Sequence, residues 1–200
     1  MRFAFFVSAI LLTACQPAYL SDGQPNPNSV YFEIPVDSKF VLRKDVTFPP
    51  YRKDMFFQNG KVSDYAAVNK WTAYCALSLH AQRQVPFTVK ADTFVATKVS
   101  RQYLFQLASA PLQVASQLDR DGFQEWRVLA TVVELSSETQ SEVARMTCAQ
   151  WGLPQDISNV TLNGMRKSFG EFVQLEIVDL RAPSAAPGKQ SHAPGGSSYQ

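Results

Sequence analysis

The only histidine outside the C-terminal tail is His80, so any acid–base chemistry that needs an imidazole would have to use it. Ser78 precedes it by two positions in a strand-like stretch, which would place the two side chains about 6 to 7 Å apart along one face. A nucleophile and its general base must approach within hydrogen-bonding distance. No Gly-x-Ser-x-Gly motif surrounds any serine. We therefore assign no catalytic residue.

Metal and cofactor motifs are equally sparse. Asp119 and Asp121 belong to an Asp-Arg-Asp-Gly stretch that matches only the first part of a calcium-binding loop, so we interpret it as a turn. The sequence has no histidine pair at zinc-binding spacing and no glycine-rich phosphate loop. Carboxylates are numerous, but nothing in the sequence selects two of them for glycosidase chemistry. We expect no metal ion and no cofactor.

Aromatic residues make up 12% of the chain and are the main candidates for a binding surface. Neighbouring side chains of a strand point to opposite faces, so the adjacent Phe56 and Phe57 cannot both enter one core. We expect most of the other aromatic residues in the core. The candidates for a glycan- or protein-binding surface are Phe56, Phe57, Trp71 and Tyr74.

The formal net charge is only +2, which is not the composition of a nucleic-acid-binding protein. Positive residues do gather in one segment, at Arg43-Lys44, Arg52-Lys53 and Lys61. We expect a solvated surface there. A site for a polyanion or a lipid headgroup is the alternative.

The N-terminus has the composition of an export signal, because Arg2 is followed by a mainly apolar run from Phe3 to Leu12. That run is far shorter than the roughly 20 residues that a membrane-spanning helix needs. The next motif is Leu12-Thr13-Ala14-Cys15. This motif resembles the lipobox of bacterial lipoproteins, which consists of Leu, a small residue, Ala and Cys.

The resemblance implies that residues 1–14 are a signal peptide and that Cys15 becomes the lipidated first residue, with palmitate among its acyl chains. Two or more acyl chains give stable anchoring, so the membrane would be one partner. Gln16 stands where an inner-membrane retention signal often has Asp, which favours the periplasmic face of the outer membrane. The alternative is an ordinary cleaved signal with a chance cysteine.

With Cys15 assigned to the lipid, Cys75 and Cys148 remain, an even number that suits one disulfide in an oxidising compartment. Strand alternation points each of them inward, beside Leu77 and Met146 respectively. We predict that they pair and join distant strands, which would stabilise the fold by roughly 4 kcal/mol. Two buried free thiols or a reactive pair are the alternatives.

The rest of the chain divides into three parts. Residues 15–29 contain several prolines and polar residues and are expected to form a flexible tether. Residues 30–181 are expected to form one β-rich domain. Residues 182–200 consist mainly of Ala, Pro, Gly and Ser and are expected to be disordered.

Within the domain, Asn59-Gly60 and Asp121-Gly122 are typical of tight β-hairpin turns. A helix is predicted late in the chain, where Leu162, Met165 and Phe169 recur at helical spacing between Thr161 and Gly170. The expected strands are Val30–Pro35, Phe40–Phe48, Met55–Phe57, Lys61–Val62, Trp71–Leu79, Val85–Val89, Phe94–Leu107, Leu112–Leu118, Phe123–Leu135, Glu142–Cys148 and Phe172–Val178.

This pattern predicts a mainly β, single-domain sandwich or jelly-roll-like body with one short helix near its C-terminal end. The function expected from it is a non-enzymatic binding or assembly module that recognises an envelope protein or glycan and no nucleic acid. A dedicated glycan or small-molecule binder is one alternative. An enzyme acting on cell-envelope material is the other.

Overall fold

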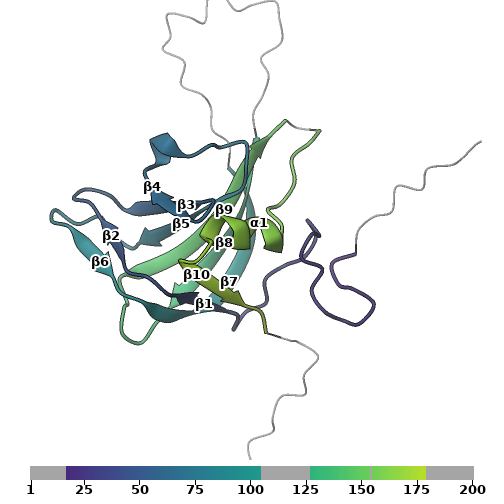
Figure 1. The fold of residues 1–200 in the computed structure, drawn as a ribbon, viewed down its shortest axis with the longest axis horizontal. Helices are drawn as coiled ribbons and strands as arrows, with labels where there is room; N and C mark the ends of the chain where they lie inside the picture. Colours follow the sequence, from purple (N-terminus) through teal and green to yellow (C-terminus); the bar gives the residue numbers. More distant parts are fainter. Residues whose placement is uncertain (1–16, 105–126, 154, 179–200) are drawn as a thin grey trace, which may run out of the picture.

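A curled antiparallel sheet of eight strands dominates the computed structural model, which describes residues 17–104, 127–153 and 155–178 (Figure 1). Two further strands, β2 (Val46–Phe48) and β6 (Phe87–Val89), pair with each other beside it. In spatial order the large sheet contains β10 (Val173–Glu176), β1 (Lys39–Leu42), β7 (Asp92–Leu104), β8 (Arg127–Ser136), β9 (Val143–Gly152), β5 (Tyr74–Leu79), β3 (Asp54–Gln58) and β4 (Lys61–Ser63). The prediction of a mainly β domain is therefore confirmed.

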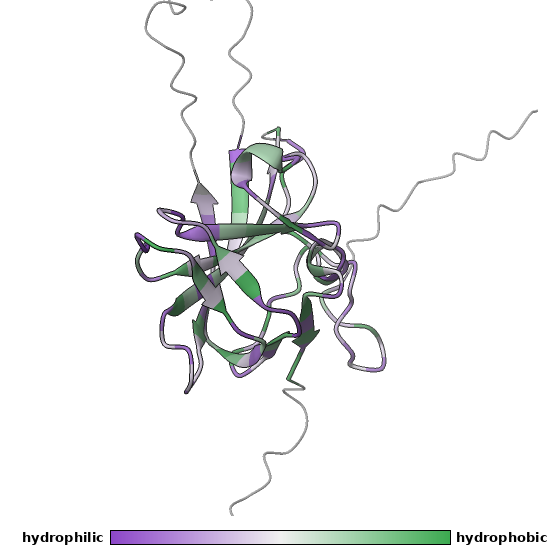
Figure 2. Ribbon diagram, turned by 60° about the vertical axis from the view of Figure 1, so that its left-hand side comes forward, coloured by the Kyte–Doolittle hydropathy of each residue, from purple (hydrophilic) through white to green (hydrophobic). Residues whose placement is uncertain are grey.

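The inner face of the curled sheet holds the main core. Alternate residues of each strand enter it, and Figure 2 shows hydrophobic residues recurring along the strands while hydrophilic ones gather in connecting loops. The largest side chains that it buries almost completely are Phe40, Phe48, Phe57, Phe94 and Phe169. Burial of so much aromatic surface is the chief source of stability in a domain of this size.

The predicted helix is present as α1 (Leu162–Phe169), which packs against β3, β5 and β10 and covers the opening of the curled sheet (Figure 1). The Thr161 hydroxyl accepts a hydrogen bond from the Gly164 N–H at 3.0 Å, as an N-cap does. At the other end Gly170 has a φ of 55°. One face of the helix, including Met165, is buried in the core.

Two glycines bring the end of α1 against the β3–β4 hairpin. Asn59 and Gly60 both have positive φ, 51° and 71°, which confirms the predicted tight turn. The Gly60 N–H donates to the Ser168 carbonyl at 3.0 Å. A Cβ atom on Gly170 would lie only 2.4 Å from the Gly60 Cα, so this contact requires glycine.

The N-terminal segment differs from its prediction. Residues 15–29 were expected to be a flexible tether, but the described part, residues 17–29, folds back on itself and packs on the domain. The Asn26 side chain donates to the Pro17 carbonyl at 2.9 Å, and the Pro27 carbonyl accepts from the Asn163 N–H at 2.9 Å. Asn26 and Ser29 are buried. The tether prediction assumed that the polar groups of this segment are hydrated. In the structure, several of them form hydrogen bonds within the protein instead.

Two strand predictions are also wrong. Val30–Pro35 forms no strand, because the carbonyls of Val30 and Phe32 accept hydrogen bonds from the Arg101 side chain instead of a neighbouring strand. Phe32 and Ile34 are nevertheless buried, so the alternation is real although the sheet partner is missing. Phe40–Phe48 is broken into β1 and β2. Cys15, the Asp121-Gly122 hairpin and the tail at 182–200 lie outside the described residues.

Candidate functional site

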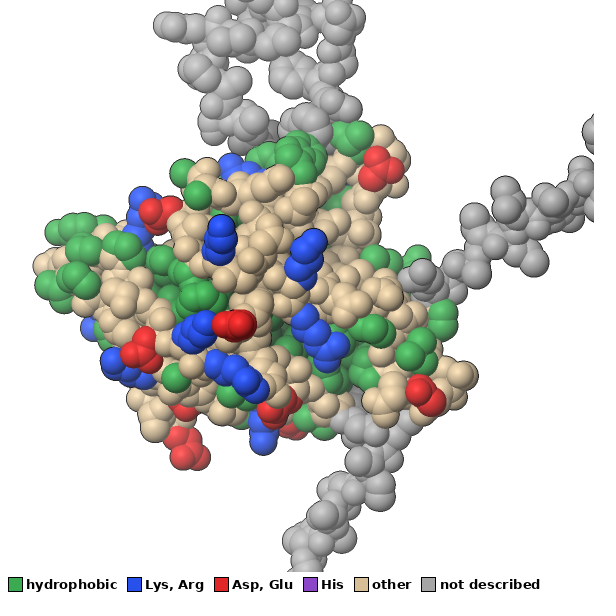
Figure 3. All heavy atoms as spheres, in the orientation of Figure 1, with side chains coloured by type: hydrophobic (Ala, Val, Ile, Leu, Met, Phe, Trp, Pro, Cys, Tyr) green, Lys and Arg blue, Asp and Glu red, His purple; other side chains and the backbone are tan. Residues whose placement is uncertain are grey.

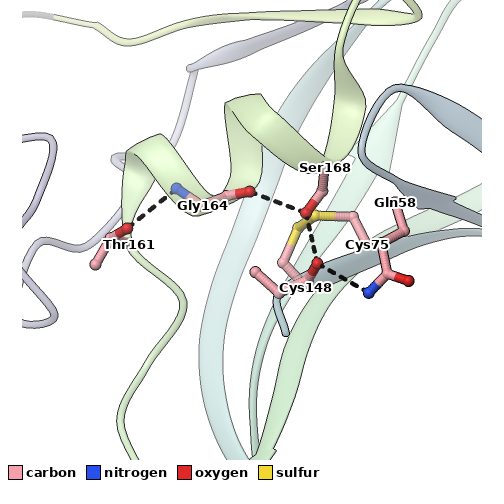
Figure 4. Close-up of a disulfide and its surroundings, with 7 residues drawn as sticks. Gln58, Cys75, Cys148, Thr161, Gly164 and Ser168 are labelled. Carbon is pink, nitrogen blue, oxygen red and sulfur yellow. Dashed lines mark hydrogen bonds between the residues drawn. A yellow bond between two sulfur atoms is a disulfide. The ribbon is translucent and has the colours of Figure 1, made fainter. Parts of the chain in front are cut away.

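The disulfide predicted between Cys75 and Cys148 is present. The two residues face each other in register on β5 and β9, with their Cα atoms 4.0 Å apart. The strands are thus neighbours in the sheet, and they are distant only in sequence, where 73 positions separate the cysteines. Figure 4 shows α1 lying over this bridge, where the Ser168 hydroxyl donates to the Ala73 carbonyl, just before β5, at 3.0 Å.

The outer face of the same strands carries a second, smaller hydrophobic cluster. Its members are Val68, Tyr74, Val128, Ala130, Val132 and Ala149, with Phe56 and Trp151 packed against them. This explains why every residue of β5 is buried, although half of them point away from the main core. The loop that contains the short 3-10 helix η1 (Tyr65–Ala67) supplies Val68 and so lies over part of this face.

A groove of about 720 Å³ runs across this outer face. Its floor is made of the small side chains of Ala76, Thr147 and Ala149, which project from the adjacent strands β5 and β9. The volume is in the range of pockets that hold small molecules or parts of longer chains.

Aromatic rings form one wall of the groove. The Phe56 ring lies 5.1 Å from that of Tyr65 and 6.2 Å from that of Tyr74. The Lys70 ammonium lies 4.3 Å from the centre of the Tyr65 ring and 5.2 Å from the centre of the Trp151 ring. These distances are typical of cation–π contacts, which hold the loop over the sheet.

Burial raises the pKa of Tyr74 to about 12, and the neighbouring Tyr65 contributes to the rise, whereas the Trp151 indole opposes it. The Tyr74 hydroxyl therefore stays protonated at physiological pH. The Trp151 N–H lies beside this hydroxyl without forming a hydrogen bond of standard geometry. The Tyr74 hydroxyl and the Trp151 N–H are thus neutral polar groups buried within the aromatic wall.

Another part of the groove lining is polar and charged. Asp54, Ser78 and Arg145 stand side by side on β3, β5 and β9, in register with one another. The Ser78 hydroxyl donates to the Asp54 carboxylate at 2.5 Å. Asp64 also lines the groove and pairs with Arg52, with a nitrogen–oxygen distance of 3.7 Å. Hydrogen-bond donors and acceptors therefore converge beside the aromatic wall.

The four aromatic residues singled out in the sequence have separate positions. Phe56 and Tyr74 line the groove. Trp71 is 49% exposed and packs edge-on against Trp151 at 5.8 Å, next to the groove. Phe57 is fully buried in the main core, where its ring meets those of Phe169 and Phe172.

The sequence analysis missed three residues of the groove: the polar Asp54 and Arg145, and Tyr65, whose ring packs beside Phe56. They lie on different strands or loops, so only the strand register brings them together. His80 is exposed and does not line the groove, and its expected neighbour Ser78 bonds to Asp54. In residues 17–104, 127–153 and 155–178 no three His, Cys, Asp or Glu side chains gather as a metal site.

No protein-family model, curated protein or solved structure matches this chain. Across the described part of the chain, none of the helices is long and apolar enough to cross a membrane. The groove itself is therefore the basis for a functional proposal.

Proposed function

We propose that this protein is a lipid-anchored protein of the cell envelope whose β domain is a non-enzymatic binding module, with the outer-face groove as its site for a glycan chain. The observation that carries the proposal is the aromatic wall beside the polar row Asp54, Ser78 and Arg145. An open groove with both elements suits a ligand that has apolar ring faces and a hydroxyl rim.

Sugar rings have that chemistry. Their C–H faces stack on aromatic rings, and their hydroxyl groups need nearby donors and acceptors. The Phe56 and Tyr65 rings supply exposed ring surface, with the buried Tyr74 behind them, and Asp54 and Arg145 supply a carboxylate and a guanidinium. The groove is open to solvent, so it could hold part of a longer ligand such as a polysaccharide.

The partners of the two carboxylates in the groove favour binding over hydrolysis. Asp54 accepts the Ser78 hydroxyl, and Asp64 is paired with Arg52. Glycosidases use one carboxyl group as a proton donor and another as a base or nucleophile, both directed at the scissile bond. Here each carboxylate is directed at a protein partner instead.

Two features support the envelope location that we propose. The motif ending at Cys15 resembles a lipobox, which supports lipid anchoring at the periplasmic face of the outer membrane. The Cys75–Cys148 disulfide suits an oxidising compartment such as the periplasm.

The proposal is tested by co-sedimentation of the full chain with isolated cell-wall sacculi and, separately, with purified surface polysaccharide. Tyr65→Ala and Trp151→Ala should each weaken binding by roughly three- to tenfold, because each removes one stacking surface. Tyr31→Ala is the matched control, since Tyr31 is 59% exposed and lies outside the groove.

Crosslinking of the native protein in envelope membranes, followed by mass spectrometry, provides the second readout. Crosslinks from groove residues to glycan support the proposal. A protein captured specifically through the groove, or equal effects of the Tyr31 and Trp151 variants, would contradict the glycan assignment.

A further inference from the structure

A second hollow, of about 760 Å³, lies on another side of the domain, between the end of β1, the end of α1 and β10. Three cationic side chains line it, those of Arg43, Lys44 and Arg166. Lys167 adjoins Arg166 in the helix, and Lys61 follows Gly60, whose backbone touches Gly170. All five cationic side chains are exposed. We call this set the basic face.

The basic face is poorly neutralised by the protein itself. Lys44 pairs with Glu171 at 2.7 Å, but Arg43, Lys61, Arg166 and Lys167 form no salt bridge within the described residues. Figure 3, which views α1 and β10 from the front, shows Lys and Arg side chains spread over this side, with acidic ones mostly toward its edge.

Half of the ten Lys and Arg residues that the structure describes outside the basic face have a carboxylate partner. They are Arg52, Arg83, Lys90, Lys98 and Arg101. One further acidic residue, Glu176, lies near the basic face. It stands opposite Lys39 in the β1–β10 pairing. Within the described residues, the basic face thus groups four cations without a salt bridge around one paired lysine, although the net charge of the chain is only +2.

The N-terminal segment reaches the same side of the molecule. Pro25 and Pro27 line a smaller hollow together with Arg166, and Asn28 accepts a hydrogen bond from the Asn163 side chain at 2.7 Å. Residues 17–29 are thus held against α1. A lipid on Cys15 would be only two residues from Pro17, where this packed segment begins.

From these two features we infer that the basic face binds the phosphate headgroups of anionic membrane lipids. Several Lys and Arg side chains at the surface of an anionic leaflet are attracted over about one Debye length, and each strengthens binding roughly fivefold. The charge argument is independent of the glycan groove. The lipid anchor of the proposed function contributes only by holding this side close to the membrane.

The test uses the full chain and vesicles of phosphatidylcholine with or without phosphatidylglycerol. Bound protein is treated with a membrane-impermeant acetylating reagent, and the modification of each lysine is followed by mass spectrometry. Lys44, Lys61 and Lys167 should be acetylated more slowly on anionic than on neutral vesicles, whereas Lys90 and Lys98, outside the basic face, should react equally on both.

Two double variants with the same change in net charge give the control. Arg43→Gln/Arg166→Gln should weaken binding of the basic face to anionic vesicles by roughly thirtyfold. It should also abolish the protection of Lys44 from acetylation. Lys90→Gln/Lys98→Gln should leave that protection intact, because those two lysines lie elsewhere and their exposed ion pairs contribute little to stability.

Flotation separates this inference from lipid anchoring. If the protein floats with both vesicle types but its lysines react equally on them, headgroup binding by the basic face is refuted and the lipid anchor is not. Protein that floats only with anionic vesicles supports the basic face and refutes the anchor. Flotation with neither refutes both, and equal loss of protection in the two double variants also overturns the inference.

Discussion

Cys75 and Cys148 face each other directly across β5 and β9, so their disulfide joins two strands that are already hydrogen-bonded neighbours. The covalent link nevertheless closes a loop of 73 positions in the unfolded chain. The Cys75→Ala/Cys148→Ala variant should therefore lose roughly 4 kcal/mol of unfolding free energy. Urea denaturation followed by circular dichroism measures this. Reduced wild-type protein should show a similar loss, and an unchanged midpoint would refute the prediction.

The contact between Gly170 and Gly60 should tolerate no side chain. Gly170→Ala would place a methyl group 2.4 Å from the Gly60 Cα at a residue with positive φ, so we expect a loss of roughly 2 to 4 kcal/mol in chemical denaturation. Gly164→Ala is the control, because its nearest neighbour is a Val160 methyl group at 3.0 Å, which can move. Equal effects of the two substitutions would argue against a special role for the Gly60–Gly170 contact.

Asp92 should make stability depend on pH in the acid range. Burial alone would raise the pKa of Asp92, but hydrogen bonds from Ser137, Thr139, Gln140 and the Thr93 N–H hold it at about 2, compared with 3.8 normally. Because the folded pKa is lowered, this stabilisation is complete above the unfolded pKa and is lost as the pH falls toward 2.

The Asp92→Asn variant should therefore be less stable than wild type by roughly 1 kcal/mol near neutral pH, because water screens hydrogen bonds to a partly exposed carboxylate. The gap should close as the pH is lowered, because the wild-type carboxylate then becomes protonated. Thermal melting over a pH series measures both values. The exposed Asp156→Asn is the control, and a gap that stays constant with pH would contradict the hydrogen-bonding explanation.

Lipidation at Cys15 is tested by metabolic labelling with palmitate together with cell fractionation. The Cys15→Ser variant should incorporate no label and should leave the membrane fraction, because the thioether cannot form. The Cys75→Ala/Cys148→Ala variant should remain labelled, since its substitutions lie in the folded domain. Retention of the label by Cys15→Ser would refute the anchor.

Local chemistry made several parts of the fold predictable. Asn59-Gly60 specified its hairpin, and Thr161 and Gly170 specified the ends of α1, because turns and caps depend on a few neighbouring residues. The pairing of Cys75 with Cys148 followed from their number and inward direction. The turn and the helix ends are encoded in short stretches of sequence. The disulfide could be deduced because only two cysteines remained after Cys15 was assigned to the lipid.

Features that depend on contacts distant in sequence were not predictable. Val30–Pro35 has the alternation of a strand, but the Arg101 side chain occupies the carbonyls that a partner strand would use. Residues 17–29 have the composition of a linker, yet Asn163 and α1 hold them in place. The groove escaped prediction for the same reason, since the register of β3, β5 and β9 decides that Asp54, Ser78 and Arg145 meet.

The position of α1 and β10 affects the timing of folding. They come last among the described elements, yet Phe169 is completely buried in the main core, and β10 pairs with β1, the first of the described strands. The core is therefore incomplete until residues near the end of the domain are available. Because strands so far apart in sequence must pair, we expect folding on the slow, millisecond-to-second scale of β proteins, after synthesis of the whole domain rather than during it.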